Sequence, residues 1–157
     1  MATSAHPTRM DAFDTDYCGI LAKAIEDDAG LTPARVLANL RKLEPIVQEF
    51  AVHQLVRALQ TATRAERAGE DLDLIVGALC HDMAKTIINA NHDAIAGEMV
   101  RPYLSEDVTW MVSHHQDFQG KHYYHVLGLD PDYDTLPLEH FEPMVHEVFS
   151  RDPSTIL

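Results

Sequence analysis

Residues 72–88 constrain the fold most, because their apolar residues would lie on nearly all sides of a helix. The run reads LDLIVGALCHDMAKTII and follows Glu70 and Asp71, acids that favour the positive end of a helix. A helix that is apolar nearly all round is buried. The sequence therefore predicts a central buried helix over 71–90. The His81-Asp82 pair inside it needs polar partners, since an unpaired buried carboxylate is costly.

Further segments carry apolar residues at helical spacing, and none alternates as a half-buried strand does. Thr32-Pro33 is typical of a helix start, whereas Gly30 and Gly69 are typical of helix ends. We therefore expect an all-α fold, a bundle of about seven helices packed around the buried one. The expected helices cover residues 11–28, 32–43, 45–69, 71–90, 92–104, 108–115 and 138–149, with a loop over 116–137.

The chain's size and composition fit one compact domain over residues 1–157, with residues 1–10 as a disordered lead-in. No apolar run approaches the roughly 20 residues that cross a bilayer, and the first ten residues lack an apolar signal core. We therefore expect a cytoplasmic protein. In that compartment Cys18 and Cys80 are expected to be thiols rather than a disulfide.

The net charge of −13 limits the classes of partner. A field of this sign repels nucleic acid and anionic membranes, which bind clustered Lys and Arg. A small-molecule substrate is favoured, with a protein partner as the other option. An anionic substrate would need a local positive site, which a metal ion or Arg57 would supply.

His81, Asp82, His92 and His115 are the residue types that bind iron, zinc, manganese or nickel. Each histidine lies within or at the end of an expected helix, from which its side chain can converge on the central one. The alternative is a satisfied buried pair, in which His81 and Asp82 bond to neighbours and Lys85 neutralises the carboxylate. Spacing alone leaves both interpretations open.

Residues 78–85 (ALCHDMAK) resemble the His-Asp-x-x-Lys helix of the HD-domain superfamily, which consists of metal-dependent helical proteins. The resemblance covers roughly residues 50–150. It is strongest to a small-protein branch close to inositol oxygenase and the phosphonate-cleaving oxygenases. The segments that carry this narrower resemblance are residues 59–65, 91–93, 101–103, 105–106, 118–120 and 130–143.

The resemblance implies metal ligands at His81, Asp82, His92 and His115. His115 is preferred to His114 because the family's histidine directly precedes the segment that matches residues 116–120. In the oxygenase branch the resemblance implies two irons, which bind a hydroxylated substrate and activate O2.

The chain departs from the family pattern at two positions. Arg57 stands where the first histidine is expected, and a guanidinium is not a metal ligand. The segment that carries the last aspartate is missing before Asp130. A site for two ions would need His53 and Asp130 as replacement ligands; one ion or none is the other outcome. In the last case Arg57 pairs with Asp82 in a polar core or an anion pocket.

The leading hypothesis is a metal-dependent HD-domain enzyme, an iron-dependent oxygenase acting on a small hydroxylated substrate. The residues expected to carry the chemistry are His81, Asp82 and Lys85, with Arg57, Lys121 and Tyr124 in the substrate pocket. One alternative is an HD phosphohydrolase. Another is a degenerate HD-fold protein that binds a ligand or does metal-free acid-base chemistry.

Overall fold

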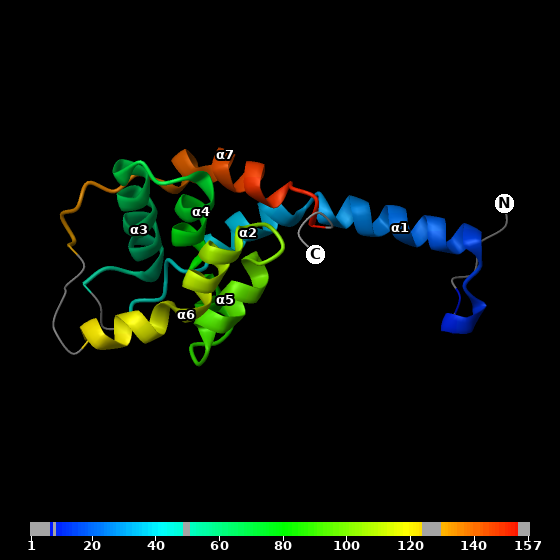
Figure 1. The fold of residues 1–157 in the computed structure, drawn as a ribbon, viewed down its shortest axis with the longest axis horizontal. Helices are drawn as coiled ribbons and strands as arrows, with labels where there is room; N and C mark the ends of the chain where they lie inside the picture. The colour runs from blue at the N-terminus through cyan, green and yellow to red at the C-terminus, as the bar shows by residue number, and fades with distance from the viewer. Residues whose placement is uncertain (1–6, 8, 49–50, 124–129, 154–157) are drawn as a thin grey trace. The chain divides into compact units, whose positions relative to one another are not determined.

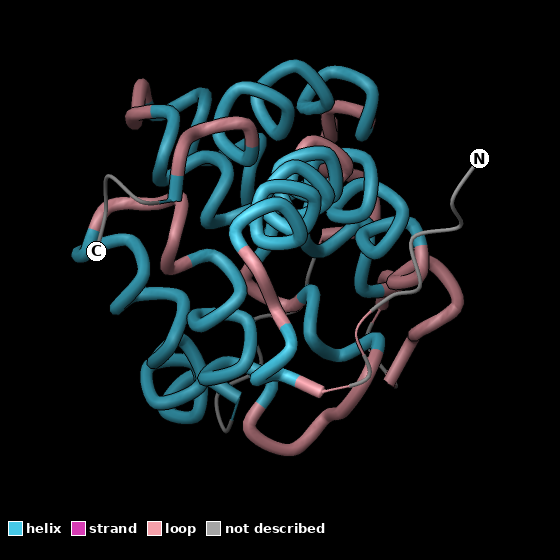
Figure 2. Tube along the Cα trace, turned by 90° about the vertical axis from the view of Figure 1, so that its right-hand side faces the viewer, coloured by secondary structure: helices cyan, strands magenta, loops and turns pink. Residues whose placement is uncertain are grey.

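The computed structural model describes residues 7, 9–48, 51–123 and 130–153. In these ranges the chain is helical, with no strand (Figure 2), which confirms the all-α prediction. None of the helices described is long and apolar enough to cross a bilayer. The α-helices are α1 (Thr15–Ala29), α2 (Thr32–Arg41), α3 (Gln54–Ala68), α4 (Leu72–Cys80), α5 (His92–Val100), α6 (Glu106–Tyr123) and α7 (Leu138–Phe149), with short 3-10 helices η1 (Met10–Ala12) and η2 (Met83–Thr86).

The chain divides into two compact units, residues 1–32 and 33–157. In the first unit, the Asp14 carboxylate accepts a hydrogen bond from the Tyr17 amide at 2.8 Å and so caps the start of α1. No residue of α1 is buried. The second unit contains the hydrophobic core and the histidines of the expected metal site. The single-domain expectation stays a prediction.

Helix α4 is the centre of the second unit, where it packs against α3, α5, α6 and α7 (Figure 1). Its residues Val76, Leu79 and Cys80 are fully buried, and they join a core that includes Leu40 of α2 and Phe141 of α7. Each fully buried side chain of this size contributes about 1.5–3 kcal/mol. The sequence pattern of residues 72–80 thus leads directly to the central position of this helix.

The prediction that this helix continues to residue 90 is wrong. Helix α4 ends at Cys80, the chain turns at Asp82, and η2 follows, so that Ile87 is 73% exposed. Side chains of neighbouring helices make this turn stable. The Asn39 amide donates to the Met83 carbonyl at 3.0 Å and thereby replaces a helical hydrogen bond. A local pattern does not reveal such a distant partner.

Other helix boundaries also differ from expectation. Helix α3 begins at Gln54 rather than near residue 45, and α5 ends at Val100 rather than at Leu104. Helix α6 runs to Tyr123 through a stretch that was expected to be loop. A single glycine such as Gly120 costs a helix only about 1 kcal/mol, so it does not end one. Helix α7 has the predicted bounds.

Two glycines allow α6 to lie close to its neighbours. A Cβ atom on Gly97 of α5 would collide with the Ser113 side chain of α6, and would lie 3.1 Å from the Ser113 Cα atom. A Cβ atom on Gly77 of α4 would collide with Val108 of α6. Only glycine permits these approaches. They bring the ends of α4, α5 and α6 that carry the histidines close to one another.

Candidate metal centre

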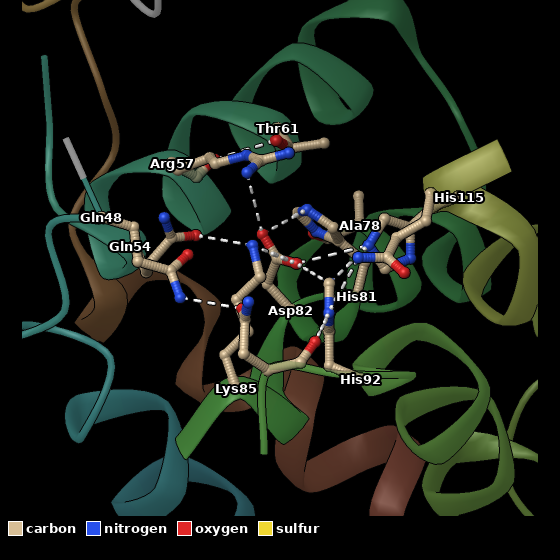
Figure 3. A network of polar contacts seen from close by, with 12 residues as sticks. Gln48, Gln54, Arg57, Thr61, Ala78, His81, Asp82, Lys85, His92 and His115 are labelled. Carbon is tan, nitrogen blue, oxygen red and sulfur yellow. Dashed lines mark hydrogen bonds and ion pairs between the residues drawn. The ribbon is translucent and has the colours of Figure 1, made fainter. Parts of the chain in front are cut away.

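A single buried carboxylate organises the candidate site (Figure 3). Asp82 lies in the turn between α4 and η2, and its side chain is fully buried. Its carboxylate is surrounded by three imidazoles and two cations. We call this group the Asp82 cluster; its members are Arg57, His81, Asp82, Lys85, His92 and His115.

Asp82, His92 and His115 place one atom each at the corners of a small triangle. Asp82 Oδ1 lies 2.9 Å from His92 Nε2 and 3.3 Å from His115 Nε2, and the two nitrogens are 3.2 Å apart. Two ligand atoms about 2.1 Å from a shared ion are separated by roughly 3.0–3.4 Å. The triangle therefore has the dimensions of a metal-binding face.

His81 extends this face on the side of the other carboxylate oxygen. Its Nε2 atom lies 3.1 Å from Asp82 Oδ2. Ligand atoms of His81, Asp82 and His115 all lie within 4.8 Å of one another. The three histidines and the aspartate that the resemblance implied as ligands thus come together at one place.

All three imidazoles are held through their Nδ1 atoms by backbone carbonyl groups three residues earlier in the chain. His81, His92 and His115 donate to the carbonyl oxygens of Ala78, Asn89 and Val112 at 2.7, 2.9 and 2.8 Å. A carbonyl oxygen only accepts, so each Nδ1 carries a proton. In a neutral ring the Nε2 lone pair is then available for a metal ion.

Three buried polar atoms at the centre lack hydrogen bonds among the described residues. His81 Nε2 and both carboxylate oxygens of Asp82 are buried, and none has a partner with hydrogen-bond geometry. Lone pairs of neutral imidazoles that approach a carboxylate repel it unless a cation lies between them. A divalent cation would satisfy these atoms at once, so the residues present fit a metal ion.

Two permanent cations occupy the remaining sides of the carboxylate. Arg57 Nη1 lies 3.4 Å from Asp82 Oδ2, and Lys85 Nζ lies 3.0 Å from Asp82 Oδ1. Lys85 also donates to Gln54 Oε1 at 3.1 Å. Arg57 thus takes up the space near Oδ2 where a second ion would need a ligand.

Burial and charge act in opposite directions on the ionisable groups. Burial raises the pKa of Asp82, but without a metal ion the attraction of a protonated His81 ring and the hydrogen bonds of His115, His81 and His92 outweigh burial and hold that pKa far below its ordinary value. The pKa of Lys85 is lowered by burial, and Arg57 lowers it further, although Asp82 opposes both. Because its pKa is lowered, Asp82 stays ionised. Burial raises the pKa of the neighbouring Cys80 thiol to about 12.

The proposed replacement ligands have other roles. The His53 ring caps α3 by accepting a hydrogen bond from the Val56 amide at 3.3 Å. Asp130 is exposed; its carboxylate accepts from the Asp132 amide at 2.9 Å, and its carbonyl accepts from Gln60. His114 is half-buried and stacks on Trp110. Neither His53 nor Asp130 makes a described contact with the Asp82 cluster.

The expected pocket residues are placed as follows. Arg57 contacts Asp82 and is absent from the walls of the pocket described below. Lys121 lies in α6, but its side chain is not described, and Tyr124 lies outside the described residues. Gln54 is fully buried and accepts a hydrogen bond from Lys85, a contact that the sequence did not predict. The expected helix started near residue 45 and so placed Gln54 in its interior, where no contact with Lys85 was expected.

An apolar pocket of about 500 Å³ leads to the Asp82 cluster. His81 and His115 form one end of it, and α3, α4 and α6 provide the walls. The centre is therefore buried on the side of Arg57 and Lys85 but can be reached on the side of the imidazoles.

A family model described as HD domain matches residues 55–149, more than half of the chain. The matched range contains every member of the Asp82 cluster. Among curated proteins, none matches this sequence.

Proposed function

Because the chain belongs to the HD domain family, we propose that it is a metal-dependent hydrolase of phosphate esters that uses one divalent ion. Asp82, His92 and His115 would hold this ion, with His81 as the fourth protein ligand. The triangle of Asp82 Oδ1, His92 Nε2 and His115 Nε2 carries the proposal, since its edges of 2.9 to 3.3 Å match the spacing of ligands around one ion.

A bound divalent ion would supply a polarised phosphoryl group and a water of lowered pKa. Four side chains of the Asp82 cluster would position the groups that take part in this chemistry. Arg57 and Lys85 fix both oxygens of Asp82 from the side away from the pocket. His81 and His115 face the pocket and so meet the phosphate end of a substrate. The two cations make the site locally positive within a chain of net charge −13, which favours an anionic group.

Metal content and phosphatase activity test this proposal together. We expect about one divalent ion per chain in protein purified without chelator. After chelation, hydrolysis of p-nitrophenyl phosphate should stop and should return with Mn²⁺, Co²⁺ or Zn²⁺. His115→Ala should lower both metal content and turnover by roughly 100-fold or more. His114→Ala is the matched control and should change neither, because His114 lies on the same helix but stacks on Trp110 rather than contacting Asp82.

An iron-dependent oxygenase is the second candidate. Two histidines and one carboxylate within 4.8 Å resemble the ligand set of non-haem Fe(II) oxygenases, which supports it. Bound iron with substrate-dependent O2 uptake, and no phosphatase turnover, would favour this candidate. A chain without metal that gains none from added ions would leave the degenerate, metal-free HD-fold hypothesis.

A further inference from the structure

The pocket beside the Asp82 cluster has one polar end and long apolar walls. Its polar end is formed by His81 and His115. Along the rest of its length the walls are mainly small or aliphatic side chains; these are Ala65, Ala68, Leu74, Ala78, Val108, Met111 and Val112. A ligand that fits these walls has a long apolar part.

Three polar side chains, Thr61, Arg64 and Glu70, also line the pocket. Glu70 is exposed and follows Ala68 by two positions, far along the chain from the imidazoles, and the other two have partners in the protein. The Thr61 hydroxyl donates to the Arg57 carbonyl at 2.9 Å. The Arg64 guanidinium lies over the Tyr133 ring, 4.2 Å from its centroid. A polyol bound here would bury several hydroxyl groups against apolar walls without partners, at a cost of about 1–3 kcal/mol each. The walls therefore disfavour the small hydroxylated substrate that the oxygenase hypothesis needs.

The direction of the helices gives the pocket its length. On α4 the lining residues run from His81 back to Leu74, which is roughly 10 Å at 1.5 Å per residue. On α3 they run from Thr61 to Ala68, which is roughly the same distance. Alanines at positions 65, 68 and 78 leave this space open. The pocket is thus an elongated channel that begins at the imidazoles.

We propose that the substrate is a phosphate monoester of an aliphatic alcohol of medium chain length. The phosphate lies at His81 and His115, and the chain extends along α3 and α4 toward Ala68 and Leu74. This inference rests on the proposed function, because the hydrolase reaction defines the polar end of the substrate. The inference adds the chemical class of the alcohol that leaves on hydrolysis. Hydrolysis breaks the bond between phosphorus and the alcohol oxygen, with water supplying the new phosphate oxygen and the alcohol proton.

Non-hydrolysable phosphonates test the pocket separately from the reaction. We expect metal-loaded protein to bind octylphosphonate at least about 100-fold more tightly than methylphosphonate, measured by calorimetry, since each methylene that enters apolar surroundings adds several-fold. Ala65→Trp should reduce this preference to less than about tenfold. Equal affinity for the two phosphonates, or a preference unchanged by the tryptophan, overturns the inference.

Two further variants show whether a reduced preference comes from a filled pocket or from misfolding of the variant. Ala68→Trp fills the outer end of the channel at an exposed position and should also reduce the preference. Ala38→Trp adds the same side chain at an exposed position of α2, outside the pocket, and should leave the preference unchanged. Thermal unfolding of each variant identifies any that is not folded.

Hydrolysis of octyl phosphate then separates the two proposals. Faster turnover of octyl phosphate than of methyl phosphate supports both. Turnover that is the same for the two esters overturns the inference and leaves the proposed function intact. Absence of any turnover with all metals, combined with a retained octylphosphonate preference, overturns the proposed function while the apolar channel stands.

Discussion

At the residue scale, the Asp82 cluster shows how much a local pattern says about a site. The residue types at 81, 82, 92 and 115 follow from the resemblance to the HD-domain superfamily, and the structure brings them together. The orientation of the imidazoles does not follow from it. Each ring is held by a backbone carbonyl three residues earlier: that of Ala78 lies in the last turn of α4, that of Asn89 in the turn before α5, and that of Val112 inside α6.

Arg57 illustrates a limit of a different kind. The sequence indicates only that a guanidinium replaces an expected histidine, and it leaves open whether the side chain enters the site. In the structure the guanidinium lies 3.4 Å from Asp82 Oδ2. Its position depends on the start of α3, which the sequence placed nine residues too early. The expectation of two irons depended on the same position.

Replacement of Asp82 tests the electrostatic role of the buried carboxylate. In metal-free buffer at pH 7, Asp82→Asn should lower the free energy of unfolding by about 3 kcal/mol, because Arg57 and Lys85 lose the charge that compensates them. Asp132→Asn, at an exposed loop position, should have little effect. Urea unfolding measures both.

The same pair of proteins gives a defined pH dependence. The pKa of Asp82 is lower in the folded chain than in the unfolded one, so the unfolded state takes up a proton first as the pH falls. The stabilisation is therefore complete above the ordinary carboxyl pKa and is lost below it. The difference in unfolding free energy between the native protein and Asp82→Asn should narrow below about pH 4. A constant difference down to pH 3 would contradict this assignment.

At the element scale, helix existence was predictable and helix length was not. Apolar spacing correctly predicted the seven α-helices found in the described part of the chain. Six of them bury one face in the core, whereas no residue of α1 is buried. The early end of α4 depends on Asn39, which lies 44 positions before the carbonyl that it binds. Such tertiary hydrogen bonds override local helix propensity, and the spacing of apolar residues in the sequence does not predict them.

Gly97 controls how closely α5 approaches α6. Gly97→Ala should lower the free energy of unfolding by about 1–3 kcal/mol, because the new methyl group collides with Ser113. Metal affinity should also fall, since the collision separates His92 from His115. Urea unfolding and metal titration measure the two effects.

Gly19 of α1 supplies the matched control for this substitution. A Cβ atom there meets nothing within 4 Å, so Gly19→Ala should leave metal affinity unchanged and should not destabilise the chain. Normal stability and metal affinity in Gly97→Ala would show that Ser113 moves aside without cost.

At the scale of the whole molecule, residues 33–157 contain the core, the Asp82 cluster and the pocket. No residue of α1 is buried. Removal of residues 1–30 should therefore change the free energy of unfolding by less than about 1 kcal/mol and should leave the metal content unchanged. Chemical denaturation and metal analysis of the shortened chain test this. A shortened chain that fails to fold would support the original expectation of one domain over 1–157.

The acidic composition of the chain also acts at this scale. A net charge of −13 raises the local concentration of divalent cations around the protein. The same field repels phosphate esters, so binding of an anionic substrate depends on the positive charge gathered at the centre. We therefore expect the acidic surface to attract the metal ion and the positive charge of the centre to attract the anionic substrate.

Cys80 has a consequence for the choice of metal. This thiol directly precedes His81, but it is fully buried in the core with a pKa of about 12 and stays protonated at neutral pH. Soft ions such as Cu(I) prefer thiolate sulfur. They find only nitrogen and oxygen donors at this centre, so the chain offers Cu(I) no sulfur ligand although a cysteine directly precedes His81.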